Sequence, residues 1–212
     1  MTDIKVAAVL FDYGGVLRRE EAAEFDAFAA RYGLPAGTLW SAFHDIPEYR
    51  ASRTGKIDDD TYRTAVTARL ATLIGEEQAA TCLAEWEALR AQDSLIVPEM
   101  LLLIRRLRTR VKVGLLSNSG RGARARLQAS AVGPLFHDIL CSAEVGLAKP
   151  EPAVYLLAAQ RLGVSAAACV FVDDMEHNVI GARAVGMRTF HYARARHLEL
   201  LRYLEGLGVL SA

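Results

Sequence analysis

The fold is decided by a stretch near the N-terminus, Val6-Ala7-Ala8-Val9-Leu10-Phe11-Asp12-Tyr13-Gly14-Gly15. It starts with an uninterrupted apolar run and ends with a carboxylate and turn-forming glycines. Such a run, bounded by turn residues, is typical of a strand buried on both faces of a parallel sheet. It is too short to cross a membrane and lacks a signal-peptide pattern. The stretch therefore predicts a buried parallel strand that carries Asp12 at its carboxyl end.

Four later segments show the same pattern, and the last is expected at a sheet edge: Val111–Leu116, Ile139–Cys141, Ala168–Val172 and Arg188–Tyr192. Amphipathic helices are predicted between them, over Pro98–Arg108, Ala153–Leu162 and Asn178–Val185. On the first of these helices, the spacing places four residues on one apolar face: Met100, Leu101, Ile104 and Leu107. Alternating strands and helices indicate an α/β fold, a Rossmann-like, doubly wound parallel sheet with helices on both faces.

The segment 19–93 interrupts this alternation because it contains no convincing strand pattern. Three amphipathic helices are predicted within it, over Glu20–Tyr32, Asp58–Ile74 and Glu76–Ala91. We therefore expect a helical cap at 19–93, inserted into a core domain that is formed by residues 1–18 and 94–212.

The composition excludes several classes of protein. The 212 residues include 25 Lys and Arg and 25 Asp and Glu, and 52% are hydrophobic, so the chain is not expected to be disordered. A net charge of +0 argues against nucleic acid or an anionic membrane as the partner. No apolar stretch is long enough to span a membrane, so a cytoplasmic location is expected. The scattered cysteines Cys82, Cys141 and Cys169 indicate reduced core thiols. The oligomeric state, monomer or homodimer, is left open.

Polar residues follow three of the predicted strands, and a fourth group lies in a loop. They are Asp12, Ser117-Asn118, Asp173-Asp174 and, in the loop Ala-Lys-Pro-Glu-Pro, Lys149. In an open parallel sheet, ligands bind beyond the carboxyl ends of the strands, so these groups are expected in one crevice. A nucleophilic carboxylate, a hydroxyl donor and a fixed cation suit phosphoryl transfer.

In this interpretation Asp12 attacks phosphorus and forms an aspartyl-phosphate. A carboxylate and a phosphate repel each other, so Mg²⁺ is expected between them, held by Asp12 and Asp174. Ser117, Asn118 and Lys149 are expected to bind the phosphorylated substrate, with Ser117 donating to a phosphoryl oxygen and Lys149 offsetting the developing charge.

Four motifs resemble, in order and spacing, those of the haloacid-dehalogenase-like (HAD) hydrolase superfamily. They are Leu10–Leu17, Leu115–Ser119, Lys149-Pro150, and Phe171–Asp174 continuing to Gly181–Met187. The helical insert lies where this superfamily places a cap. The stretches around Gly55 and Ser117 look most like those of sugar-phosphate phosphatases and of the N-terminal phosphatase domain of soluble epoxide hydrolase.

The resemblance implies a role for each matching residue. It makes Asp12 the nucleophile and a metal ligand, and it adds a metal contact from the backbone carbonyl of Gly14. Asp174 becomes the third protein ligand, with Asp173 beside it. Asn178 stands where many relatives have another acid. The implied substrate is a small phosphorylated molecule.

One position departs from the superfamily pattern. Most of its phosphatases have Asp at the position of Gly14, where it protonates the leaving group. General acid catalysis contributes about 10²–10⁴-fold. The glycine therefore implies a slow enzyme, a different residue as the proton donor, or a substrate whose leaving oxygen is weakly basic, and we favour the last, with sugar 1-phosphates as the expected type.

Two alternatives remain at this stage. In a 2-haloacid dehalogenase, Asp12 would attack carbon, without a metal, and Gly14 would be tolerated; the Asp173-Asp174 pair argues against this reaction. A non-catalytic binding or regulatory protein with the same fold would also tolerate Gly14. Of the remaining candidates, His177 is expected to face solvent or to lie behind the metal site, and Trp40 and Trp86 are expected to pack between cap helices.

Overall fold

The computed structural model describes residues 4–20, 22–92 and 95–211. Its centre is a five-stranded sheet in the order β3-β2-β1-β4-β5, and all of its strand pairs are parallel. The strands are β1 Ala8–Phe11, β2 Lys112–Ser117, β3 Asp138–Cys141, β4 Cys169–Asp173 and β5 Arg188–His191. The α/β fold class is confirmed, and β5 lies at an edge as predicted.

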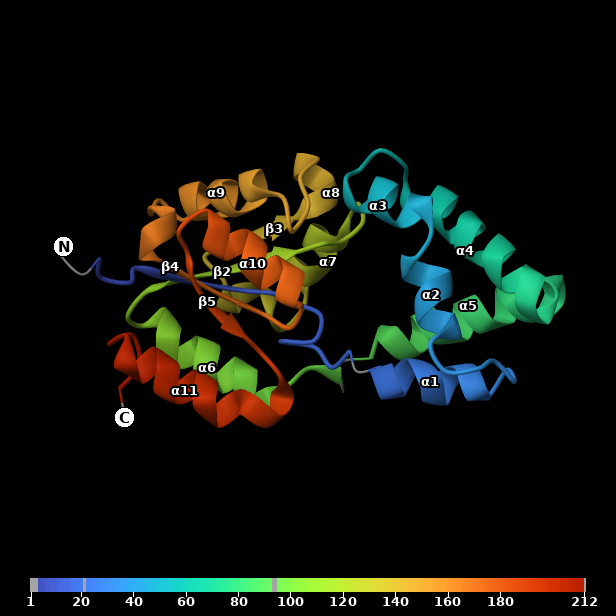
Figure 1. Cartoon of the computed structure of the whole chain (residues 1–212), viewed down its shortest axis with the longest axis horizontal. Helices are drawn as coiled ribbons and strands as arrows, with labels where there is room; N and C mark the ends of the chain where they lie inside the picture. Colours follow the sequence, from blue (N-terminus) through green and yellow to red (C-terminus); the bar gives the residue numbers. More distant parts are fainter. Residues whose placement is uncertain (1–3, 21, 93–94, 212) are drawn as a thin grey trace.

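Helices cover both faces of the sheet (Figure 1). Alternate residues of a strand point to opposite faces, so Val9 and Phe11 join one hydrophobic cluster while Ala8 and Leu10 join another. The first cluster includes residues of α6 Pro98–Arg108, α7 Ala123–Ala129 and α11 His197–Gly206. The second includes residues of α9 Pro152–Arg161 and α10 Glu176–Ala184. The short elements are α8 Ser142–Val145 and the 3₁₀ turns Gly133–Leu135, Ala166–Ala168 and Arg194–Arg196.

Helix α6 has the predicted bounds, but its buried face is rotated from the expected one. Leu103 is buried with Met100, Ile104 and Leu107, whereas Leu101 is only partly buried. The sequence pattern allowed either face because α6 contains three consecutive leucines, of which Leu102 is 60% exposed. Helix α6 packs against β2 and the turn Gly133–Leu135, and this packing selects the face that contains Leu103.

Between β1 and α6 the described residues form five α-helices, which we call the helical insert: α1 Ala22–Ala30, α2 Thr38–His44, α3 Pro47–Arg53, α4 Asp59–Ile74 and α5 Glu76–Arg90. It projects from one end of the sheet (Figure 1). The start of α4 is capped by Asp58, whose Oδ1 accepts a hydrogen bond of 2.8 Å from the Thr61 N–H. Helices α2 and α3 were not predicted, and each has only seven residues.

The helical insert has a hydrophobic cluster of its own, which contains Phe25, Phe28, Leu70 and Trp86. Its two connections to the sheet run side by side, since the Arg19 N–H donates to the Leu95 carbonyl and the Val97 N–H donates to the Leu17 carbonyl, both at 2.8 Å. The predicted cap boundary at 93/94 falls outside the described residues and stays a prediction. None of the helices within the described ranges is long and apolar enough to cross a membrane.

Candidate active site

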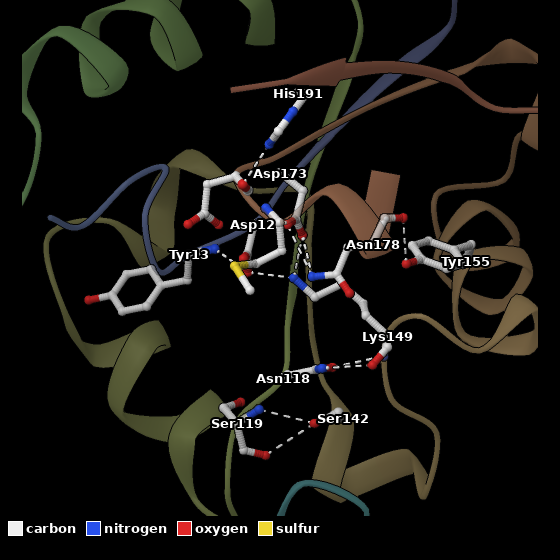
Figure 2. Close-up of polar contacts among 12 residues, drawn as sticks. Asp12, Tyr13, Asn118, Ser119, Ser142, Lys149, Tyr155, Asp173, Asn178 and His191 are labelled. Atoms are coloured by element: carbon white, nitrogen blue, oxygen red, sulfur yellow. Dashed lines mark hydrogen bonds and ion pairs between the residues drawn. The ribbon is translucent and has the colours of Figure 1, made fainter. Parts of the chain in front are cut away.

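The carboxyl ends of β1, β2 and β4 bring together polar side chains that lie far apart in the sequence (Figure 2). Asp12 follows β1, Ser117 ends β2, and Asp173 ends β4. Ligand oxygens of Asp12, Asp173 and Asp174 lie within 4.8 Å of one another. The convergence predicted for these residues is therefore present.

Lys149 lies between two of these carboxylates. Its Nζ is 2.7 Å from Asp12 Oδ1 and 2.7 Å from Asp173 Oδ2, and its side chain is 1% exposed. Burial by itself would lower the pKa of Lys149, but the charges of Asp12 and Asp173 outweigh it and raise the pKa above its ordinary value. Lys149 is therefore a fixed cation.

The carboxylates outnumber this cation. Burial raises the pKa of Asp12 well above its ordinary value, against the charge of Lys149, and Asp173 and Asp174 raise it further. Burial and the charge of Asp173 raise the pKa of Asp174 to about 6. Three close carboxylates and one lysine give the site an excess of negative charge. The carboxylate oxygens are ligands that suit Mg²⁺, so this composition fits that ion.

Asp173 is distinguished by hydrogen bonds to both of its carboxylate oxygens, whereas in Asp12 a backbone hydrogen bond and the ion pair both involve Oδ1. Besides Lys149, Asp173 accepts hydrogen bonds from the Met175 N–H at 2.8 Å and from Asn178 Nδ2 at 3.0 and 3.2 Å. Tyr155 in turn donates its hydroxyl to the Asn178 carbonyl at 2.8 Å. Asp173 is therefore built to hold Lys149 in place, whereas Asp174 lines a cavity at this edge and the Asp12 side chain keeps 11% of its surface exposed.

Asn118 holds the backbone of the lysine loop. Its Nδ2 donates to the Lys149 carbonyl and its Oδ1 accepts from the Lys149 N–H, both at 2.9 Å. Ser117, directly before it, is 6% exposed. The structure thus gives Asn118 a positioning role, and the predicted substrate contacts of Ser117 and Asn118 stay predictions.

Two further contacts at this edge were not expected from the sequence. Gly15 has φ +68°, and a side chain there would overlap the Asp174 carboxylate, so only glycine fits. His191, the last residue of β5, donates from Nε2 to the Asp174 carbonyl at 2.8 Å. The double glycine was a usable signal for the first contact. The second depends on the β4–β5 pairing, which no local pattern shows.

The residues that were predicted to face solvent or to pack in the interior lie in those places. His177 is exposed on α10. Trp86 is buried in the cluster of the helical insert, and Trp40 stacks on His44 with 3.8 Å between ring centroids. Cys82, Cys141 and Cys169 are buried free thiols.

This geometry defines a class of protein: a parallel α/β fold with a carboxylate–lysine site at the carboxyl ends of its strands, next to a helical insert. Comparison with known families identifies it further. The pattern of the haloacid dehalogenase-like hydrolases matches residues 6–186, and the chain belongs to this family. The predicted superfamily is thereby confirmed.

Individual relatives agree with this assignment. The chain is 38% identical to phosphatase MT3486 of Mycobacterium tuberculosis over 104 residues, which are 47% of this chain and 48% of that protein. The match thus spans about half the length of this relative. A HAD family enzyme from Bacteroides thetaiotaomicron, solved as a variant with magnesium and inorganic phosphate, has a TM-score of 0.67 at 21% identity and covers 93% of this chain and 100% of its own. The L-2-haloacid dehalogenase RSc1362 has a TM-score of 0.69 at 24% identity and covers 95% and 99%.

Proposed function

We propose that the protein is a Mg²⁺-dependent phosphohydrolase that acts through an aspartyl-phosphate on a small phosphorylated metabolite. The observation that carries this proposal is the cluster of Asp12, Asp173 and Asp174 at the carboxyl ends of the strands, with the buried cation Lys149 paired to Asp12 and Asp173. The named phosphatase relative and the neighbour solved with magnesium and phosphate support the same chemistry.

Each residue of the site has its own role in the proposed reaction. Asp12 attacks phosphorus, and the bond to the leaving oxygen breaks as the aspartyl-phosphate forms. Lys149 and the Ser117 hydroxyl stabilise the negative charge on the phosphoryl oxygens. Asp12, Asp174 and the Gly14 carbonyl would hold Mg²⁺, which supplies positive charge between nucleophile and phosphate when bound. Asp173, supported by Asn178, keeps Lys149 in place.

The substrate is expected to be a small molecule, with sugar phosphates among the candidates. The helical insert lies over the carboxyl end of the sheet, where it can exclude water and select the leaving group (Figure 1). Arg121, which follows β2, donates to the Gly55 carbonyl of the insert at 2.7 Å, so the stretch around Gly55 is held close to Ser117.

Dehalogenation is the second candidate, because Gly14 is compatible with it and a named dehalogenase shares the fold. In that reaction Asp12 attacks carbon and releases a halide. The cluster of Asp12, Asp173 and Asp174 favours the phosphohydrolase, since dehalogenation has no need for a cation site.

The test is hydrolysis of p-nitrophenyl phosphate with Mg²⁺, with EDTA, and by Asp12→Asn. We expect turnover only with Mg²⁺ and an intact Asp12, while Asp60→Asn, an exposed site in the helical insert, keeps full activity. Turnover that survives EDTA or Asp12→Asn would refute the proposal. Metal-independent chloride release from 2-chloropropionate would establish the dehalogenase, and inactivity towards both substrates would indicate a binding protein.

A further inference from the structure

Gly14, the position where most family phosphatases carry the acid, is not an empty position in this protein. Its φ lies outside the left-handed region, so the backbone there accepts a side chain. A Cβ on Gly14 would overlap one carboxylate oxygen of Glu20, and apart from its chain neighbours no other described residue lies within 4 Å of it. The carboxylate of Glu20 therefore stands where a side chain at position 14 would begin.

Glu20 is held there by the helical insert. Arg90, near the end of α5, lies 3.0 Å from Glu20 Oε2, and the two side chains are 12% and 27% exposed. The same guanidinium donates to the Arg19 carbonyl at 3.0 Å and lies 3.8 Å from Glu24 Oε2. The segment that connects the sheet to the insert therefore places the Glu20 carboxylate next to the loop that follows β1.

Glu20 also faces the space next to the proposed metal site. A cavity of about 440 Å³ is lined by Gly15, Glu20, Asp174, His191 and Tyr192, among others. Glu20 and Asp174 therefore line the same cavity. A carboxylate in this position has access to a leaving group that departs from phosphorus.

We propose that Glu20 is a catalytic residue that takes the place of the acid missing at Gly14. This proposal rests on the phosphohydrolase function proposed above. As Asp12 bonds to phosphorus and the bond to the leaving oxygen breaks, that oxygen takes a proton from Glu20. Water then attacks the aspartyl-phosphate and releases free Asp12 and dihydrogen phosphate, which keeps both protons of the water, and the Glu20 carboxylate takes up a proton from solvent. Glu20 thereby regains its starting state, and weakly basic leaving groups are no longer required of the substrate.

Leaving-group dependence separates this role from a structural one. Glycerol 2-phosphate has a basic leaving oxygen and needs the proton, whereas p-nitrophenyl phosphate does not. We expect Glu20→Gln to lower kcat by about 10²-fold on glycerol 2-phosphate and by less than about 3-fold on p-nitrophenyl phosphate. Glu24→Gln is the matched control, because Glu24 contacts the same Arg90 without reaching Gly14. It should leave both activities unchanged, and thermal unfolding should show that both variants fold.

A rescue variant tests the position directly. In Glu20→Ala the space beside Gly14 is free, so the additional change Gly14→Asp restores a carboxylate there. We expect Gly14→Asp/Glu20→Ala to regain at least about 10-fold of the glycerol 2-phosphate activity that Glu20→Ala loses.

Three results would overturn the role of Glu20: equal losses on both substrates, no loss on glycerol 2-phosphate, or a wild-type protein that hydrolyses p-nitrophenyl phosphate alone. All three leave the proposed phosphohydrolase intact. Loss of that function shows differently, as wild-type protein without turnover that depends on Mg²⁺ and Asp12.

Discussion

In the part of the chain that the structure describes, the sheet region buries polar side chains, whereas the helical insert buries almost none. Of the seven buried polar or charged residues within the described ranges, only Ser52 belongs to the insert. The other six lie at the carboxyl edge of the sheet or in its flanking loops and helices: Asp12, Ser117, Ser142, Lys149, Asp173 and Asn178. The insert instead buries aromatic rings, such as Phe25 and Trp86 with 4.4 Å between centroids.

Ion pairs show the same contrast. Lys149 and Asp173 are 1% and 0% exposed, whereas Arg31 and Glu85 of the insert pair at the same 2.7 Å with 57% and 42% exposure. A buried charge is costly unless it is paired, so the buried charges at the edge of the sheet indicate a functional role. The exposed ion pairs of the insert contribute little to stability. Arg90, at 12% exposure, is the intermediate case, and it lies where the insert returns to the sheet.

Replacing Lys149 should have the largest effect. Lys149→Met leaves two buried carboxylates without their cation, so we expect the free energy of unfolding to fall by about 3–5 kcal/mol. Activity on p-nitrophenyl phosphate should fall by about 10²–10³-fold. Chemical denaturation of the metal-free protein measures the first effect. Arg31→Met, which breaks an exposed pair of the same length, should cost less than about 1 kcal/mol. Similar costs for both variants would erase the contrast.

The separation of the two hydrophobic cores can be tested next. Leu70 of α4 and Leu107 of α6 are both 0% exposed, one in each core. Leu70→Ala and Leu107→Ala should each lower the free energy of unfolding by about 2–5 kcal/mol. In the double variant the losses should add within about 0.5 kcal/mol, because the two leucines belong to separate hydrophobic clusters. A coupling energy above about 1 kcal/mol would mean that the cores act as one.

The pH dependence of stability is a smaller effect, and the part of it that depends on Asp174 reports on the sheet edge. The pKa of Asp174 is raised from 3.8 to about 6, so between these values the folded protein binds a proton that the unfolded chain does not. Asp174 should therefore add on the order of 1 kcal/mol to the stability of the metal-free protein as the pH falls from 7 towards 4. The lowered pKa values of three histidines act in the opposite direction: His44, His137 and His197. Thermal unfolding across this range should show that the contribution of Asp174 is missing in Asp174→Asn. An unchanged profile in that variant would contradict the assignment.

The smallest effect concerns contact between the two regions. Arg50 of the insert pairs with Glu151 of the lysine loop at 2.9 Å, with 68% and 35% exposure. Arg50→Ala should change the free energy of unfolding by less than about 1 kcal/mol, and less still at high salt. Arg63→Ala, which breaks the Arg63–Glu87 pair inside the insert, is the control. A loss above about 2 kcal/mol from Arg50→Ala alone would show that the insert depends on this contact for stability.

Prediction from sequence succeeded where a residue's surroundings are local. The strands were recognised because β1, buried on both faces, has to be apolar throughout. The long helices α4 and α5 carry clear start and stop residues, such as Asp58 and Gly75. The seven-residue helices α2 and α3 were missed, since two turns are too few for a periodic signal.

The candidate site was likewise predictable in part: the residues at strand ends could be predicted, but their supporting partners could not. Asp12, Asp173 and Lys149 were singled out because a parallel sheet gathers the carboxyl ends of its strands at one edge. The support from Tyr155 and His191 was not predictable, because it depends on which helix and which strand lie next to the site.

By itself, the sequence determined a parallel α/β sheet, a helical insert after the first strand and a carboxylate–lysine site, because apolar periodicity and strand-end residues are local properties of a chain. Only the tertiary structure decided that Asn118 holds Lys149, that Asp173 is saturated by its partners, and that Glu20 fills the space beside Gly14. These are contacts between segments whose relative position follows from packing. The sequence shows that position 14 lacks a side chain, and the folded chain shows that the Glu20 carboxylate lies beside it.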